Sequence, residues 1–327
     1  MLDFASDAAA VAACIFVVAR PQCVVYFFIW LPVAMGGSAI MDEDPSEIVR
    51  SFFDNYGWVE GPEGLSGEEK QFRRFRPAYR AYTRGCAERT LACFRSRTGT
   101  SLFAGCGDMP ETHVRLARQF SKIYCMDISR VALERARERL GGSAAYLLES
   151  ITETKLEDNS VDAVYCAHVI YHIGRALQER AVQQLIRVTR PGGRIVVIYA
   201  NPGSPFTFPG AMMRWAKRLR SRNAGALTPT WATADAVPEH YYHVNPLRWW
   251  RRFEGNCRIE FLPWEIIGSR PASALLWSDG MASAFYRAAG WAEARVPALA
   301  VRLWQYPIIV LDKKKAGDRQ GTRGTPA

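Results

Sequence analysis

The stretch SLFAGCGDMPETHVRLARQF, residues 101–120, decides the fold, because a short apolar run ends in two closely spaced glycines and leads directly into a helical segment. That segment has the 3.6-residue apolar period of a helix that covers a sheet. Downstream, short apolar runs alternate with further amphipathic stretches. The strand candidates are 101–105, 122–126, 144–148, 161–166 and 194–200, and the helix candidates are 111–120, 128–140 and 175–189. This alternation predicts an α/β fold, with a parallel, doubly wound, Rossmann-like sheet and helices on both faces.

The flanking regions depart from the alternation and define the expected domain organisation. We expect an apolar N-terminal segment at 1–40, a helical cap at 41–97, the Rossmann-like core at 98–200, an inserted lid at 201–278, a closing part at 279–312 and a disordered tail at 313–327. In the closing part, SAFYRAAGW at 283–291 predicts a last helix that stops at Gly290. WAEARV at 291–296 and YPIIVL, which ends at Leu311, predict two closing strands.

Residues 8–35 form the most apolar stretch of the chain. An Arg-Pro-Gln triplet at 20–22 splits it into runs of twelve and thirteen residues, short of the ~20 that a membrane-spanning helix needs. Acidic residues and no Lys or Arg precede it, which is the reverse of a signal peptide. Three interpretations stay open: a mis-assigned start, with translation from Met35 or Met41, a membrane anchor, and a signal peptide.

Composition excludes several classes of protein. Hydrophobic residues make up 49% and charged residues 23% of the 327-residue chain, which is ordinary for a globular protein and excludes a mainly disordered or disulfide-framework chain. The net charge of +10 is spread along the sequence, so it favours solubility or an acidic partner and no nucleic acid. The eight cysteines include no C-x-x-C pair. We therefore expect buried thiols in a reducing, cytoplasmic compartment and no structural metal.

The turn after the first strand carries a nucleotide-type signature. Gly105 and Gly107 let the backbone approach a ligand closely at the start of a helix. Asp127 follows twenty residues after Gly107, at the end of the second strand, where a carboxylate accepts both ribose hydroxyls of an adenosine. Pro110 stands where a dinucleotide site has its third glycine, and no P-loop motif occurs. S-adenosyl-L-methionine (SAM) has no phosphate and needs only the short turn and the ribose acid. The alternative is a plain tight turn without a ligand.

Four motifs in a fixed order extend this signature: LFAGCG at 102–107, YCMDIS at 124–129, VDAVYC at 161–166 and RPGGR at 190–194. Over about residues 45–312 the chain resembles class I SAM-dependent methyltransferases of the type 11, ubiquinone/menaquinone-methyltransferase-like kind. The resemblance implies a seven-stranded sheet with a reversed final hairpin, SAM as cofactor and methyl transfer to a small molecule. It implies cofactor contacts at Ala104, Gly105, Cys106, Gly107, Asp127, Ile128, Ser150, Ile151 and Cys166.

The chain departs from the family pattern at three positions. Phe103 replaces the usual acid of the first motif, and Met109 replaces its third glycine. Ser150, beside Glu149, stands where an acid usually lies near the adenine amino group. Two other functions therefore stay open. One is a catalytically degenerate protein that binds SAM or a nucleoside, and the other is a nicotinamide-dependent oxidoreductase, which the missing third glycine disfavours.

Histidines are the candidates for chemistry on the acceptor. The chain has five, and His168 and His172 follow the fourth strand, while His243 lies in the aromatic segment 240–253. Ligands of open α/β sheets bind beyond the carboxyl ends of the strands, and a neutral His is a suitable general base for oxygen methylation. We therefore predict His168, His172 and His243 as catalytic candidates on an oxygen acceptor. Structural roles for these residues, methylation by proximity alone, and carbon or nitrogen acceptors stay open.

The basic segment MMRWAKRLRSR at 212–222 has two interpretations. It is an ordinary surface helix, or it belongs to a lid over an acidic, lipid-linked or glycan-attached acceptor and touches a membrane surface. The sequence does not indicate the oligomeric state.

Overall fold

The structure is a computed structural model, and it describes residues 45–58, 77–207, 241–315 and 317 together with two residue pairs near the N-terminus. The chain divides into two units, Met1–Glu43 and Asp44–Ala327. In the first unit the described residues are β1 (Ala19–Arg20) and β2 (Cys23–Val24), which pair antiparallel. All further description concerns the second unit.

Some of the expectations fall outside the described residues. They are the interpretations of residues 8–35 apart from the two short strands, the basic segment 212–222, and the tail after residue 317. No helix in the described part of the chain has both the length and the apolar character needed to cross a membrane.

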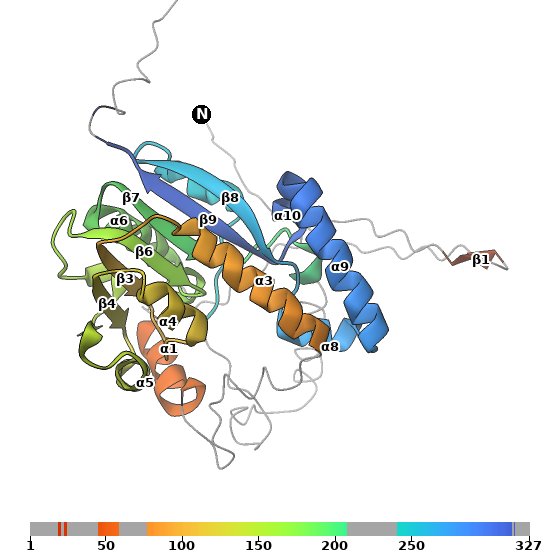
Figure 1. Ribbon diagram of the computed structural model, residues 1–327, viewed down its shortest axis with the longest axis horizontal. Helices are drawn as coiled ribbons and strands as arrows, with labels where there is room; N and C mark the ends of the chain where they lie inside the picture. The colour runs from red at the N-terminus through yellow and green to blue at the C-terminus, as the bar shows by residue number, and fades with distance from the viewer. Residues whose placement is uncertain are drawn as a thin grey trace, which may run out of the picture. The chain divides into compact units, whose positions relative to one another are not determined.

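A seven-stranded mixed sheet forms the centre of the second unit (Figure 1). Its strands are β3 (Thr100–Ala104), β4 (Lys122–Asp127), β5 (Ala144–Leu148), β6 (Val161–Ala167), β7 (Thr189–Ile198), β8 (Cys257–Glu265) and β9 (Tyr306–Lys313). They lie in the order β5-β4-β3-β6-β7-β9-β8. β3 to β7 are parallel, and β9 is antiparallel to both β7 and β8. The predicted Rossmann-like sheet and its reversed final strand are confirmed.

Helices cover both faces of this sheet, as the amphipathic periods predicted. On one face, α4 (Glu111–Ala117), α5 (Arg130–Leu140) and the end of α3 (Pro77–Cys93) pack in one apolar cluster. On the other face, α6 (Gln178–Val188) and the short helix η8 (Leu247–Phe253) pack in a second cluster. The strand order reverses between β3 and β6, so their carboxyl ends mark the switch point at which doubly wound sheets bind ligands.

A third apolar cluster lies at the β8 end of the sheet. It joins α3, α8 (Ser269–Leu275), α9 (Asp279–Arg295) and α10 (Pro297–Leu303) to the end of β8. The remaining short elements are α1 (Ser46–Phe52), η1 (Phe53–Gly57), η2 (Gly141–Ser143), η3 (Ile151–Glu153), η4 (Ile170–His172), η5 (Arg175–Leu177) and η6 (Pro205–Thr207).

The closing part of the sheet differs from the prediction. WAEARV at 291–296 is not a strand, because α9 runs to Arg295 and does not stop at Gly290. A short apolar run does not distinguish strand from helix, and a glycine inside a helix costs only about 1 kcal/mol. The second closing strand is β8, inside the region predicted as a lid. Pro263 lies within β8, where it is tolerated because β8 is an edge strand.

The second half of the predicted lid segment 240–253 is part of the core. Residues 247–253 form η8, and Trp250 and Phe253 are buried against the apolar face of the sheet. The Tyr199 ring meets the Trp250 ring at a centroid distance of 5.0 Å. The dense aromatic composition of this segment therefore reflects core packing from Leu247 onward.

The predicted start of the disordered tail, at residue 313, is wrong. Lys313 is the last residue of β9 and is buried. Its ammonium group donates to the carbonyl oxygens of Ile186 and Thr189, at 2.8 and 2.7 Å, and to Asn159 Oδ1 at 2.8 Å. These acceptors lie near the end of α6, where helix carbonyls have no partner within the helix. The Lys-rich composition gave no sign of this role.

Candidate cofactor and acceptor site

The turn after β3 brings the backbone close to its neighbours in a way that only glycine permits. Gly105 has φ 66° and Gly107 has φ 57°, both in the left-handed region. A Cβ on Gly105 would lie 2.3 Å from Cγ2 of Val169, and one on Gly107 would lie 3.0 Å from the Trp58 ring. The Gly105 and Cys106 N–H groups donate to the carbonyl of Met126, at 2.8 and 3.0 Å. The turn is thus joined to the end of β4.

Asp127 lies at that end of β4 with its carboxylate held by two backbone groups. Oδ2 accepts from the Gly107 N–H and Oδ1 from the Ser129 N–H, both at 2.9 Å. A carboxylate oxygen has two lone pairs, so each can accept a further hydrogen bond from a ribose hydroxyl. Burial raises the pKa of Asp127 to about 6, with a smaller contribution from the nearby charge of Asp54. The group is therefore ionised at neutral pH.

The predicted adenine side follows β5. Ser150 begins η3, where its hydroxyl accepts from the Thr152 N–H at 3.3 Å and lies 2.8 Å from Thr152 Oγ1. The Glu149 carboxylate forms its hydrogen bonds within the following loop. Its Oε2 accepts from Thr154 Oγ1 and from the Lys155 N–H, both at 3.1 Å. Ser150 is thus the polar side chain placed at this position, and the neighbouring acid is held elsewhere.

Most of the remaining predicted cofactor residues are buried, and their contact with a cofactor stays a prediction. Ala104, Ile151 and Cys166 are buried in one apolar cluster, and Ile128 is half-buried. Burial, with the charge of Asp127 as a second cause, raises the pKa of the Cys166 thiol. Cys106 is buried in the cluster on the other face, so it contributes its backbone to the turn.

A short segment that the sequence analysis did not single out covers the turn. Asp54 in η1 accepts a hydrogen bond from the hydroxyl of Ser129, which also caps α5. Phe53 stacks on Trp58 with ring centroids 5.5 Å apart, and Trp58 adjoins Gly107. η1 is a π-helical turn, a rare element that often marks functional sites. Its sequence carries no motif, and only its position before α3 placed it in the predicted cap.

His168 follows β6 at the carboxyl edge and has φ 61°, which is uncommon outside glycine. Its Nδ1 lies 2.8 Å from the Tyr171 hydroxyl. The ring lies between Trp264 and Tyr306, with centroid distances of 5.2 and 5.1 Å. Burial lowers the pKa of His168 to about 4, so the ring is neutral at physiological pH.

His172 is held by the aromatic segment. Its Nδ1 lies 2.9 Å from the carbonyl oxygen of Tyr241. A carbonyl only accepts, so Nδ1 carries the proton and the lone pair is on Nε2. The ring lies 4.5 Å from Tyr171 and 6.2 Å from Phe53, measured between centroids. This tautomer is the one that a general base acting through Nε2 requires.

His243 contacts Tyr171 and Gln178 through its backbone. Its N–H donates to the Tyr171 carbonyl at 2.8 Å, and its own carbonyl accepts from Gln178 Nε2 at 2.9 Å. Burial, followed by the charge of Arg175, lowers the pKa of its imidazole. The structure thus gathers all three predicted histidines around Tyr171, a residue to which the sequence gave no role at the site.

His113, another of the five histidines of the chain, was not among the predicted catalytic candidates. Its Nδ1 is buried without a hydrogen-bond partner among the described residues, and its ring lies 4.9 Å from that of Tyr165. Burial, with the charge of His168 as a second cause, lowers its pKa to about 4. Its position on α4, directly after the glycine turn, was the sequence feature that could have identified it as a candidate site residue.

The glycine turn and Asp127 thus meet at the switch point of a Rossmann-like sheet. The family model described as a methyltransferase domain matches residues 102–197, which span β3 to β7. Residues 102–197 therefore match a methyltransferase domain.

Two curated relatives illustrate the likeness in sequence. The chain is 26% identical over 109 residues to the ubiquinone/menaquinone biosynthesis C-methyltransferase of Escherichia fergusonii, a match of 32% of this chain and 43% of the relative. The same figures hold for the enzyme of that name from Salmonella newport. The match thus spans less than half of the length of these relatives.

Solved structures to which the chain is similar include two methyltransferases. Geranyl diphosphate C-methyltransferase from Streptomyces coelicolor is 15% identical, with TM-score 0.48, over 84% of this chain and 99% of that chain. Magnesium protoporphyrin IX methyltransferase from Synechocystis is 13% identical, with TM-score 0.47, over 85% of this chain and 100% of that chain.

Proposed function

We propose that the protein transfers a methyl group from SAM to a small-molecule acceptor, and that the acceptor atom is oxygen. The observation that carries the proposal is the Asp127 carboxylate. Two backbone N–H groups at 2.9 Å orient it at the switch point of the sheet, beside a glycine turn. The matched methyltransferase domain, residues 102–197, supports the transfer reaction.

The residues present fit the adenosine part of SAM. Asp127 would accept from the ribose hydroxyls, the Ser150 hydroxyl would face the adenine, and Ile128 would contact its ring. The backbone at Gly105 and Gly107 would lie close to the methionine part. When bound, SAM supplies a methyl group on a sulfonium, which is reactive toward a nucleophilic oxygen.

On the acceptor side, His172 is our first candidate for the general base, with His168 and His243 behind it. The Tyr241 carbonyl accepts from Nδ1–H of His172, which puts the lone pair on Nε2, the atom through which a general base would take a proton from an acceptor hydroxyl. His168, with a pKa near 4, is unprotonated at neutral pH but a weak base. It is better suited to accept a hydrogen bond that orients the acceptor.

Transfer of a labelled methyl group from SAM into a small-molecule cell extract tests this assignment. We expect His172→Gln to slow incorporation about 10²- to 10⁴-fold, because a positioned base contributes that much. His168→Gln should slow it about tenfold, and both variants should bind SAM as the wild type does. If His172→Gln incorporated the label at the wild-type rate, His172 would not be the general base. Transfer by proximity alone would then be the remaining explanation.

A second candidate function is SAM or nucleoside binding without catalysis. It is favoured by Phe103, which stands in place of the first-motif acid and is buried against Tyr165 and His113. The same experiment separates the two functions. A protein that binds SAM and transfers no methyl group to any component of the extract is the non-catalytic one.

We further propose that the acceptor is acidic, lipid-linked or attached to a glycan. The support is the Arg-rich sequence at 212–222, which lies outside the described residues. A triple change of Arg218, Arg220 and Arg222 to Ala should weaken use of the acceptor and leave SAM affinity unchanged. Unchanged use of the acceptor would argue against this part of the proposal.

A further inference from the structure

Large apolar side chains are exposed on the outer side of the α8–α10 end of the molecule. Of the nine exposed large hydrophobic residues in the described chain, six fall within 275–303. They are Leu275 at 39%, Trp277 at 76%, Trp291 at 61%, Val296 at 39%, Leu299 at 51% and Leu303 at 37% exposed. Val296, Leu299 and Leu303 recur at the spacing that aligns side chains along one side of a helix. We call Trp291, Val296, Leu299 and Leu303, together with the exposed arginines among them, the apolar-basic face.

The exposed charges between residues 280 and 305 have one sign, whereas Asp279, near Trp277, is an exposed acid and lies outside the face. Between residues 280 and 305 the exposed charged side chains are Arg287, Arg295 and Arg302. Glu293 is the acid in this range, and its side chain is only 7% exposed because it pairs with Arg89. The face thus combines exposed Trp and Leu with cationic groups and presents no carboxylate between residues 280 and 305.

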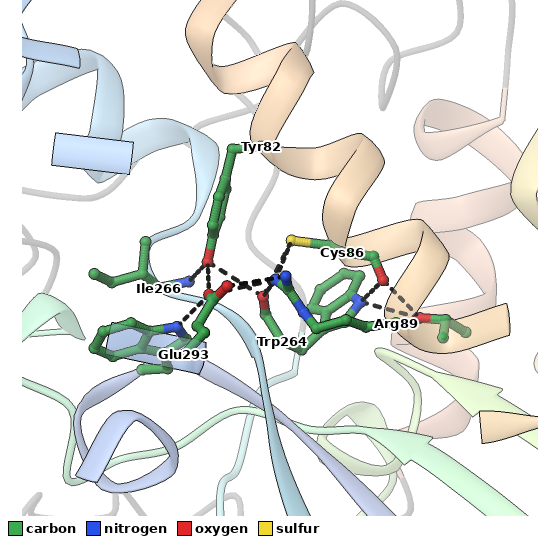
Figure 2. Close-up of polar contacts among 8 residues, drawn as sticks. Tyr82, Cys86, Arg89, Trp264, Ile266 and Glu293 are labelled. Atoms are coloured by element: carbon green, nitrogen blue, oxygen red, sulfur yellow. Dashed lines mark hydrogen bonds and ion pairs between the residues drawn. The ribbon is translucent and has the colours of Figure 1, made fainter. Parts of the chain in front are cut away.

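A buried network keeps this face turned outward. Figure 2 shows the Glu293 carboxylate at the meeting point of α3, β8 and α9. It accepts from the Tyr82 hydroxyl at 2.6 Å and from Trp304 Nε1 at 2.7 Å, and it pairs with Arg89 Nη1 at 2.9 Å. The inner side of α9 is filled by buried residues such as Tyr286. The exposed Trp and Leu side chains therefore have no space to turn into the core.

We propose that the apolar-basic face binds the surface of an anionic phospholipid bilayer. Trp side chains favour the boundary between water and hydrocarbon, where the ring is buried and the N–H stays hydrated. Arginines beside them are attracted to anionic headgroups. A second copy of the chain fits less well, because two such faces would bring arginines of like charge together.

Co-sedimentation of the full-length protein with vesicles tests the proposal. We expect binding to vesicles of equal parts phosphatidylcholine and phosphatidylglycerol, and much weaker binding to phosphatidylcholine alone. The double variant Trp291→Gln/Leu299→Gln should lower the partition coefficient at least about tenfold, through lost apolar burial. Changing Arg287, Arg295 and Arg302 to Gln should lower it to a similar degree on the anionic vesicles only, with the salt dependence reduced.

Matched controls lie elsewhere on the surface. Ile48 and Leu148 are 53% and 48% exposed, so Ile48→Gln/Leu148→Gln removes comparable apolar area. Exposed Arg95, Arg118 and Arg130, all changed to Gln, remove the same charge from other elements. Both control variants should sediment with the vesicles as the wild type does.

Three results would overturn the proposal. The first is equal sedimentation of the face variants and the wild type, which would assign binding to another part of the chain such as residues 8–35. The second is no binding of the wild type to either vesicle. The third is a wild-type dimer in solution that does not bind vesicles and that dissociates in the Trp291→Gln/Leu299→Gln variant. SAM titration of the same proteins keeps any of these results separate from the proposed methyl transfer.

Discussion

The glycine turn and the α9 end of the molecule lie in one unit but are stabilised by different kinds of bond. At the turn, backbone N–H groups hold the Asp127 carboxylate, and the partners lie within twenty residues of it. At the α9 end, side chains hold Glu293, and the Tyr82 hydroxyl reaches it across 211 residues of sequence. Changes at the turn should therefore affect chiefly ligand binding, whereas changes in the network should affect chiefly stability.

The largest effect is expected at Glu293. Its replacement by Ala leaves Arg89 without its ion-pair partner and removes the acceptor of two further hydrogen bonds. Breaking a mostly buried pair in this way costs about 3–5 kcal/mol, which urea unfolding would measure. Glu88→Ala, which breaks the exposed pair with Arg115, should cost less than about 1 kcal/mol. Equal losses in the two variants would show that the network is not a special source of stability.

Gly105→Ala should have the next largest effect. The left-handed φ and the approach of Val169 to within 2.3 Å of a Cβ together cost about 2–4 kcal/mol. The second change Val169→Ala should restore part of the loss, because it removes the contact and leaves the backbone strain. Gly142, which has nothing within 4 Å of a Cβ, should tolerate Ala with a change within about 0.5 kcal/mol. Thermal unfolding of the four proteins would test this ranking.

Glu265 provides a smaller, pH-dependent effect. Its side chain is buried and accepts from the Tyr79 hydroxyl at 2.7 Å, and burial raises its pKa to about 7. The folded state therefore holds a proton that the unfolded state releases near pH 4.5, so this stabilisation is present at low pH and is lost as the pH rises through 7. Glu265→Gln should gain about 1–3 kcal/mol relative to the wild type between pH 5 and 8. A difference between the two proteins that does not change with pH would contradict this.

The sequence was most informative where the chemistry is local. Gly105, Gly107 and Asp127 belong to adjacent strand ends, and the pattern that predicts the strands also predicts their meeting. The sequence could not predict that Asp54 and Trp58 cover the turn, because no periodic pattern links η1 to it. Nor could it predict β8, since Pro263 interrupts the apolar run and only the antiparallel pairing with β9 makes it a strand. The meeting of Tyr171 with His243 likewise could not be predicted, because His243 comes from a distant part of the sequence.

The most direct test of the cofactor assignment is calorimetric titration of the full-length protein with SAM and with S-adenosylhomocysteine, alongside Asp127→Ala. We expect micromolar binding that Asp127→Ala weakens at least about tenfold, the loss of a charged hydrogen-bond partner. Because the pKa of Asp127 is about 6, binding to the wild type should also weaken as the pH falls below 6, and the variant should lack this dependence. Folded wild-type protein that binds neither ligand, or equal binding by the variant, would contradict the account.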